Sequence, residues 1–313
     1  MIKYYKYRKR AKRFLALTSF KVEEFDALLP EFEKSFLERM AKYTLDGKER
    51  KKRSYVDYQN SPLPSIGEKL FFILSYLKCY PLQELQAALF GISQPKANQW
   101  IHCLTPVLQD ALTRMGEVPV RDMANLVVRS KGQNLFFHDG TERPIPRPLD
   151  AEMQRLFYSG KAKMHTIKNN LLIDDSCRIL FLTTTVEGKR HDKKLADESG
   201  YILPKGSRLL QDTGFQGFTL DDVAILQPKK KPKGQSLSDL DKSVNQWLSS
   251  LRIRMEHAIG GVQRLRIVKD KIRNWKKDFR DSVMEISCAL HNFRLKFRPW
   301  HYPPIQLHLF VEM

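Results

Sequence analysis

The sequence predicts an all-α domain that ends near residue 120 and a mixed α/β domain that follows it. Three observations predict this division. Apolar residues recur at helical spacing before residue 117, whereas short runs rich in β-branched and aromatic residues begin at about residue 133. Two long helical segments then close the chain. Strands followed by interleaved and trailing helices are typical of a mixed α/β fold.

The composition predicts a protein that binds DNA. The 313 residues include 54 Lys and Arg against 35 Asp and Glu, which gives a net charge of +19. Such a chain favours a polyanion, because neutralising phosphates releases their counterions. A membrane surface is the competing polyanion. We disfavour it because the basic residues are spread along the chain and form no single amphipathic segment.

The cysteines and the apolar runs predict the compartment. Cys79, Cys103, Cys177 and Cys288 are far apart and form no C-x-x-C pair, which disfavours a zinc ribbon and indicates a reducing environment. No apolar run is long enough to span a membrane, and the apolar stretch after the basic N-terminus is too short for a signal peptide. We therefore expect a cytoplasmic protein.

Residues 1–60 are expected to form a basic arm and one helix. In residues 1–20, Tyr4, Tyr5 and Tyr7 are interleaved with Lys and Arg. Residues 21–46 carry apolar residues at helical spacing. The charged run Lys48–Arg53 predicts a linker, and Ser61-Pro62-Leu63-Pro64 marks a domain boundary.

Residues 61–120 are predicted to form a helix-turn-helix domain. One helix is expected over Ile66–Tyr76 and a second over Pro81–Leu89. Gly91 is expected to end the second helix, and Ser93 to cap the third. A helix, a glycine-containing turn and another helix is the arrangement in which the second of the two helices enters the DNA major groove.

The helix after Gly91 begins with side chains of the types that contact bases or phosphates. These residues are Gln94, Lys96, Asn98 and Gln99. An ordinary helical hairpin with a polar outer face would have the same pattern. Both interpretations stay open for this segment alone.

The mixed α/β domain is predicted over residues 130–300, with a tail at 301–313. A short helix is expected after His191-Asp192, and long helices over about residues 237–265 and 279–297. The predicted strands are Leu135–His138, His165–Ile173, Ile179–Val186, Arg208–Gln211 and Val223–Gln227.

Three carboxylates have local settings that suit metal binding. Asp139 and Asp212 each end a short apolar strand beside a glycine turn. Glu256 lies on a predicted helix, with Arg252 one turn before it. Two Asp on strands and a Glu on a later helix can hold two Mg²⁺ ions about 3.5–4 Å apart, which is the arrangement that cuts and joins phosphodiesters.

Each carboxylate also has an ordinary explanation. Asp139 and Asp212 could be turn residues that bond their own backbone, and Glu256 could be an exposed residue paired with Arg252. Asp192 is a rival second carboxylate. It follows a predicted strand less closely, so we expect it at a helix start, as a cap or a supporting group. The metal-site prediction therefore depends on the three residues occurring together, in this order.

Two lysine-rich segments are expected to contact DNA phosphates. Lys229, Lys230 and Lys231 lie in a loop between the last predicted strand and the helix of Glu256. Lys161, Lys163 and Lys168 lie on the first hairpin of the α/β domain. The alternative for both segments is a solvated loop without a partner.

Several motifs follow one another in fixed order between Phe136 and Phe293. They include Tyr158-Ser-Gly-Lys-Ala-Lys-Met-His165, Arg190-His191-Asp192-Lys193, Gln211-Asp212-Thr-Gly-Phe-Gln-Gly217, Pro228-Lys-Lys-Lys-Pro-Lys-Gly234, Arg254-Met-Glu256-His257-Ala-Ile-Gly260 and Ala289-Leu-His291-Asn292-Phe293. In these motifs the chain resembles the DDE-superfamily transposases of bacterial insertion sequences, in the branch akin to Harbinger transposases. The helix-turn-helix ahead of the motifs also fits that family.

The resemblance implies an RNase H-like catalytic domain that cuts DNA at terminal inverted repeats and joins the 3′ ends to target DNA. It implies two Mg²⁺ ions, with Mn²⁺ as a substitute, and a homo-oligomer on double-stranded DNA in the nucleoid, without a membrane partner. Asp139, Asp212 and Glu256 occupy the catalytic positions, and Asp192 and His257 are expected to support them without binding metal. The alternative is a catalytically idle DNA-binding protein derived from a transposase.

The family pattern around the Glu is only partly kept. Arg252 matches the family Arg and is expected to contact DNA. Ser249 and Gln263 stand where the related pattern has Tyr and Lys, which puts the auxiliary DNA contacts in doubt. The neighbouring Arg264 could replace the missing Lys.

Overall fold

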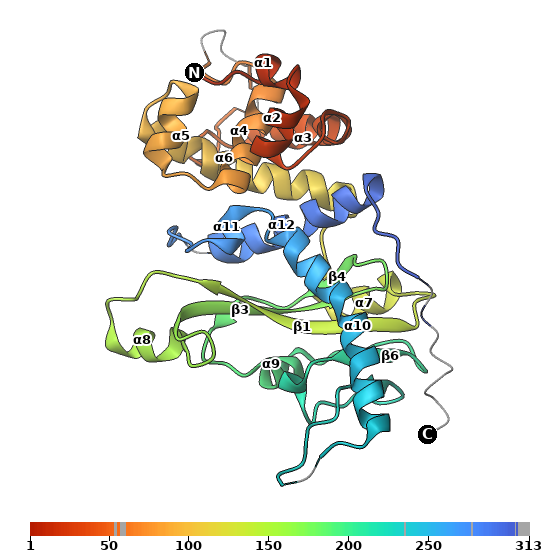
Figure 1. The fold of residues 1–313 in the computed structure, drawn as a ribbon. Coiled ribbons are helices and arrows are strands. Elements are labelled where there is room, and N and C mark those ends of the chain that lie inside the picture. Colours follow the sequence, from red (N-terminus) through yellow and green to blue (C-terminus); the bar gives the residue numbers. More distant parts are fainter. Residues whose placement is uncertain (53–54, 57–60, 235, 277, 304, 306–313) are drawn as a thin grey trace. The chain divides into compact units, whose positions relative to one another are not determined.

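The computed structural model describes residues 1–52, 55–56, 61–234, 236–276, 278–303 and 305 (Figure 1). The chain divides into two compact units. The helical unit consists of Met1–Val118 and Val262–Phe297, and the sheet unit of Pro119–Gly261 and Arg298–Met313. No helix among the described residues is both long and apolar enough to cross a membrane.

Helices of different lengths pack around an aromatic core in the helical unit. Ser65 begins the most deeply buried of them, because its hydroxyl accepts a hydrogen bond from the backbone N–H of Glu68. The helices are α1 (Tyr4–Arg8), α2 (Ala11–Thr18), α3 (Val22–Lys42), α4 (Ile66–Cys79), α5 (Gln83–Phe90), α6 (Gln94–Arg114), α11 (Arg266–Lys269) and α12 (Phe279–Phe297).

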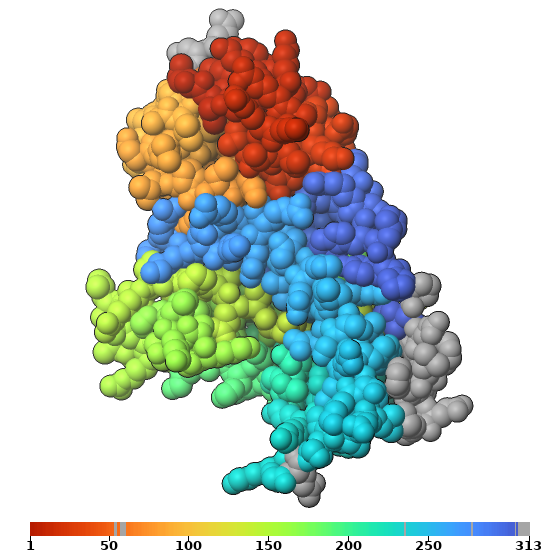
Figure 2. Space-filling view, viewed as in Figure 1, coloured from red at the N-terminus to blue at the C-terminus, as the bar shows by residue number. Residues whose placement is uncertain are grey.

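The prediction of a basic arm over residues 1–20 is wrong, because these residues form α1 and α2 and help to build the core. Tyr4 stacks on Phe25, with ring centroids 5.1 Å apart. Phe14 is fully buried and stacks on Phe71 at 5.6 Å. In Figure 2 these N-terminal residues (red) form one continuous surface with the residues of α5 and the start of α6 (orange). The aromatic residues among the Lys and Arg thus serve packing.

The helix-turn-helix consists of α5, a turn at Gly91–Ser93 and α6. Gly91 has φ +70°, the left-handed conformation that glycine adopts without steric cost, and it ends α5 as predicted. Ser93 stands at the N-cap of α6, but its side chain makes no capping hydrogen bond. Ser93 therefore occupies the N-cap position, but the capping hydrogen bond predicted for its side chain is not formed.

The structure assigns residues 262–297 to the helical unit, whereas the sequence grouped them with residues 130–300. The helix expected over 237–265 ends at Val262, and α12 packs against α6. Gln109 of α6 donates a hydrogen bond to the Glu285 carboxylate, and Asn292 donates to the Glu117 carbonyl at 2.9 Å. These contacts join segments that are distant in sequence.

A mixed sheet forms the centre of the second unit (Figure 1). Its strands lie in the order β2-β3-β1-β6-β7, and β4 and β5 also pair with β3. β1 is antiparallel to β3 and parallel to β6, which is parallel to β7. The strands are β1 (Leu135–Pro144), β2 (Tyr158–Ser159), β3 (Met164–Ile173), β4 (Ile179–Leu182), β5 (Val186–Glu187), β6 (Arg208–Gln211) and β7 (Ala224–Leu226). Helices α7 (Met123–Arg129), α8 (Ala151–Phe157), α9 (Asp192–Ser199) and α10 (Asp239–Val262) complete the unit.

This arrangement confirms the predicted fold class, a mixed sheet flanked by helices and preceded by a helix-turn-helix. The largest differences from the predicted strands occur at residues 179–187 and at β1. The segment expected as one strand over 179–186 is divided into β4 and β5. β1 continues to Pro144, so Asp139 lies in the middle of a strand, and Gly140 pairs with Asn170 of β3 instead of forming a turn.

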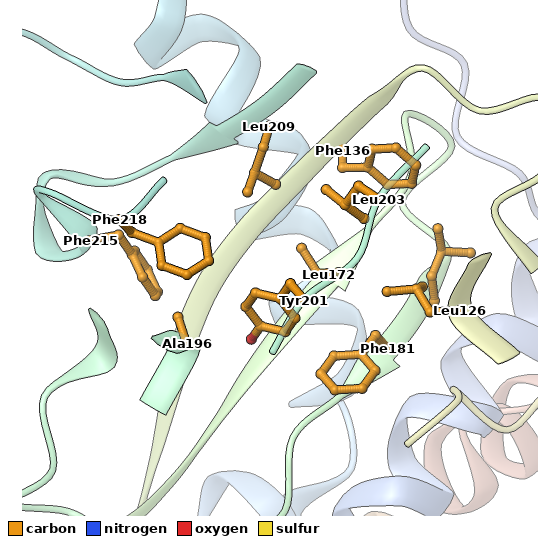
Figure 3. Close-up of a cluster of buried hydrophobic side chains, with 11 residues drawn as sticks. Leu126, Phe136, Leu172, Phe181, Ala196, Tyr201, Leu203, Leu209, Phe215 and Phe218 are labelled. Atoms are coloured by element: carbon orange, nitrogen blue, oxygen red, sulfur yellow. The ribbon is translucent and has the colours of Figure 1, made fainter. Parts of the chain in front are cut away.

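Alternation along β1 places its side chains on opposite faces of the sheet. Phe136 and His138 face a buried cluster with Leu172, Leu209 and Tyr201 (Figure 3). Burial lowers the pKa of His138 to about 3, so its imidazole stays neutral in this core beside the Tyr201 hydroxyl, 3.1 Å away. The residues in between, Phe137 and Asp139, point to the other face.

The packing of residues 1–20 can be tested by truncating one ring. Phe14→Ala should destabilise the helical unit by about 3–5 kcal/mol, because it removes a fully buried ring and leaves a cavity. Tyr5→Ala is the matched control, since Tyr5 is 59% exposed, and it should change the stability little. Chemical unfolding followed by circular dichroism measures both. Equal stability of the two variants would mean that residues 1–20 are an unpacked arm.

Candidate active site

Two carboxylates meet where β6 ends beside β1. The parallel register pairs His138 with Gln211, and the next residue on each strand is an aspartate, Asp139 and Asp212. Residues paired in parallel strands point to the same face of a sheet, so the two side chains are neighbours. Asp212 ends β6 because it caps a short 3₁₀ turn, its Oδ1 accepting a hydrogen bond from the Thr213 N–H at 2.6 Å.

Asp139 is a mostly buried carboxylate with other carboxylates nearby. Its pKa is raised to about 6, first by burial and then by the neighbouring Asp212 and Asp192 carboxylates. The Gly140 N–H, which donates to Oδ1 at 2.7 Å, and the Arg252 guanidinium act in the opposite direction. A buried carboxylate close to other carboxylates is typical of a site for a cation.

Helix α10 brings one positive charge to the two aspartates. Arg252 Nη2 lies 3.2 Å from Asp212 Oδ2. Glu256 is exposed and follows Arg252 by four residues, so it lies on the same face of α10 one turn further along. Among the residues that the structure describes, no three Asp, Glu, His or Cys side chains are close enough together to hold a metal ion. The structure thus brings Asp139 and Asp212 together and leaves Glu256 apart from them.

Asp192 approaches the site from the opposite face of the sheet. Its Oδ1 lies 3.0 Å from Lys168 Nζ, and Lys168 also pairs with Glu142 at 3.2 Å. Lys168 is only 5% exposed, so this lysine is held between two carboxylates with little access to water. Asp192 is the first residue of α9, whose N-cap is His191. Asp192 stands at a helix start as expected, but its carboxylate binds Lys168.

Gly140 leaves room for the Asp192 carboxylate against β1. A Cβ at position 140 would lie 3.0 Å from the Asp192 carboxylate and 3.2 Å from Asn170 Oδ1, tighter than ordinary contacts. The Asn170 amide also donates to the Asp192 carbonyl at 2.9 Å, which fixes the start of α9. Glu142 was not predicted to belong to the site, although alternation along β1 places Gly140 and Glu142 on one face. Lys168 was expected to contact DNA phosphate, but here it pairs with two carboxylates.

A pocket of about 670 Å³ lies beside Asp212 and Asp192. Basic side chains make up much of its wall, namely Lys161, Lys168, Lys189, Arg190 and Lys230. Of the lysines expected to contact phosphate, Lys161, Lys168 and Lys230 therefore line it. Lys229 pairs with Asp241 at 3.0 Å, and Lys231 is exposed on the same loop. Lys163 lies in the turn between β2 and β3, with φ +53°.

The four polar residues at the start of α6 behave as two pairs. Gln94 and Asn98 both donate to Oε1 of Gln83 on α5, at 2.8 and 3.0 Å. Lys96 instead donates to Gln99 Oε1 at 3.1 Å, and Lys96 is exposed. Gln94 and Asn98 thus help to join the two helices, whereas Gln99 accepts from Lys96 and donates from its amide to Asp46.

Comparisons with known proteins agree with both halves of this description. A family model described as "DDE superfamily endonuclease" matches residues 138–292, and one described as "Helix-turn-helix of DDE superfamily endonuclease" matches residues 61–114. The "Probable transposase for insertion sequence element IS702" of Microchaete diplosiphon is 27% identical over 233 residues, which cover 74% of this chain and 82% of that protein. No solved structure matches the chain.

The raised pKa of Asp139 predicts a stability effect that depends on pH. The folded pKa of about 6 exceeds the usual value near 3.8, so ionisation opposes folding. The contribution of protonated Asp139 to the free energy of unfolding is therefore present at low pH and is lost as the pH rises through 6. Asp139→Asn should therefore stabilise the metal-free protein at pH 8 by about 1–2 kcal/mol after allowance for solvent screening, and by almost nothing at pH 4.

Thermal unfolding in a chelator at the two pH values measures this difference. Asp197→Asn is the control, because Asp197 is half exposed and pairs with Lys193 on the surface. A lower stability of Asp139→Asn than of the unmodified protein at pH 8 would contradict the assignment of Asp139 to a repulsive site.

Proposed function

This chain belongs to the DDE superfamily of endonucleases, and we propose that it is a transposase that cuts DNA at the terminal inverted repeats of its element and joins the 3′ ends to target DNA. The juxtaposition of Asp139 and Asp212 at the end of β6 carries this proposal. Family membership supports an endonuclease, and the helix-turn-helix supports binding to double-stranded DNA. The Harbinger-like branch stays a prediction.

The residues present suit a divalent metal. Asp139 and Asp212 offer only oxygen atoms, the donors that Mg²⁺ and Mn²⁺ prefer. Arg252 brings one positive charge to this pair, and burial raises the pKa of Asp139, an effect that a bound cation would oppose. We propose that Asp139, Asp212 and Glu256 hold two Mg²⁺ ions. Bound metal would increase the acidity of the attacking hydroxyl and stabilise the leaving oxygen.

Glu256 would join the other carboxylates from the face of α10 that it shares with Arg252. Glu256 and Arg252 share that face, and Arg252 now contacts Asp212. A cation at the two aspartates would compete with the Arg252 guanidinium for the same carboxylates. We propose that Arg252 then turns to a DNA phosphate.

The remaining residues would bind DNA or stabilise the β-strands that carry the site. Lys161, Lys189 and Lys230 on the pocket wall would neutralise phosphates next to Asp212. The ion pair between Asp192 and buried Lys168 would fix α9 against β1 and β3. An element has two ends, so we propose that two or more copies of the chain act together on DNA. The rival proposal, an idle DNA-binding protein, predicts binding without cleavage.

The triad is tested by replacing each carboxylate with its amide. Asp139→Asn, Asp212→Asn and Glu256→Gln should each lower the Mg²⁺-dependent cleavage of terminal-repeat DNA by about a hundredfold or more, because each removes charge stabilisation in the transition state. Binding of the same DNA should stay largely intact. Asp197→Asn serves as the charge-matched control. Full cleavage by any of the three variants would remove that residue from the site.

The helix-turn-helix is tested by separating phosphate contacts from base contacts. Lys96→Ala should weaken binding to all DNA sequences and reduce the slope of log K against log salt by about 1. Gln99→Ala should cost about 1–3 kcal/mol at one base position of the terminal repeat only. Lys34→Ala on α3 provides a control of equal charge, since Lys34 is exposed outside the motif. If both variants keep their preference for the terminal-repeat sequence, residues outside the helix-turn-helix recognise that sequence.

A further inference from the structure

Arg254 lies on the side of α10 turned away from the carboxylate site. It is two residues from both Arg252 and Glu256, about 200° around the helix, and it is only 5% exposed. Its guanidinium donates from Nη1 to the Asp175 carbonyl at 2.9 Å and from Nη2 to the Pro303 carbonyl at 3.0 Å. A buried arginine with several fixed acceptors restricts both the rotation and the position of its helix.

Tyr302 completes this contact from the C-terminal segment, residues 298–303. The Arg254 guanidinium carbon lies 4.5 Å from the centre of the Tyr302 ring, within the range of a cation–π interaction. The Tyr302 hydroxyl lies 2.7 Å from His257 Nδ1 and 3.3 Å from Cys177 Sγ. A tail was predicted from residue 301. Tyr302 and Pro303 instead contact α10, and residues 304 and 306–313 lie outside the described part.

The third side of the contact is the turn between β3 and β4. Asp174 Oδ1 accepts hydrogen bonds from the backbone N–H groups of Ser176 and Arg178, both at 2.9 Å, which holds the turn in one shape. The Sγ atom of Cys177, which lies on this turn, is 3.3 Å from the Arg254 carbonyl oxygen. Burial raises the Cys177 pKa to about 11, so the thiol stays protonated and can donate. β3 in turn pairs with β1 at Asp139, through Leu171.

We infer that Arg254 and Tyr302 are positioning residues for the active site. They join α10, the β3–β4 turn and the C-terminal segment, and so set the rotation of α10 relative to the strands that carry Asp139 and Asp212. Arg252 and Glu256 on the other side of the helix then face the aspartates. This inference rests on the proposed function, because Glu256 is placed in the site by that proposal.

The test compares Tyr302→Ala and Tyr302→Phe with the unmodified protein. Tyr302→Ala should raise the Mg²⁺ concentration for half-maximal cleavage by about tenfold and lower kcat by a similar factor, as the loss of a supporting partner usually does. The Kd for terminal-repeat DNA should stay unchanged. Tyr302→Phe keeps the ring over Arg254 and loses only the hydroxyl, so its effect should be intermediate. His301→Ala, at an exposed neighbouring position, should match the unmodified protein.

A second measurement does not depend on cleavage. In Tyr302→Ala, hydrogen exchange at the amides of residues 250–258 should become faster, while exchange in β1 stays the same. If the unmodified protein fails to cut DNA, the proposed function fails, and this exchange measurement still tests the contact.

Three results would overturn the inference. The first is unchanged Mg²⁺ dependence and unchanged exchange in folded Tyr302→Ala. The second is a parallel loss of kcat, DNA affinity and thermal stability, which would indicate a general structural role. The third applies if Tyr302→Ala does not fold, in which case Tyr302→Phe is the deciding variant. A Mg²⁺ dependence of Tyr302→Phe equal to that of the unmodified protein would then overturn the inference.

Discussion

The parallel pairing of β1 with β6 is the constraint on which the candidate site depends. The pair His138–Gln211 fixes the register, and a shift of one residue would turn either Asp139 or Asp212 to the opposite face of the sheet. The register is held by burial on the other face, where Phe136 and Leu209 belong to the cluster of Figure 3. The core therefore determines which carboxylates meet, although none of its side chains takes part in the chemistry.

Charge balance is the second constraint. Asp139, Asp212 and Asp192 come close to one another, and such repulsion requires positive partners. The structure supplies these partners from different elements, Arg252 from α10 and Lys168 from β3. Lys168 is buried, so its ion pairs are shielded from water, and removing one partner would leave a buried charge unpaired. Arg252 is more accessible, which suits a residue that exchanges one anionic partner for another.

Local patterns predicted much of the fold. β6 was predicted with the bounds that the structure has, and α12 likewise, because each lies between clear breaks in periodicity. Gly91 ends α5 as its position in the sequence indicated. The errors occurred where distant partners decide. β1 extends past Gly140 because β3 lies beside it. Residues 1–20 fold because aromatic rings in this segment stack on Phe71 and Phe25.

Periodicity, turn residues and short motifs are local properties of the chain, and they were enough to predict the fold class, the helix-turn-helix and the candidate carboxylates. How these residues meet depends on the folded units. Folding places Asp192 against Gly140, pairs Arg252 with Asp212 instead of Glu256, and packs Tyr302 against Arg254. Each of these contacts joins segments far apart in sequence. Strand register and helix rotation set such contacts, and both depend on the packing of the whole unit.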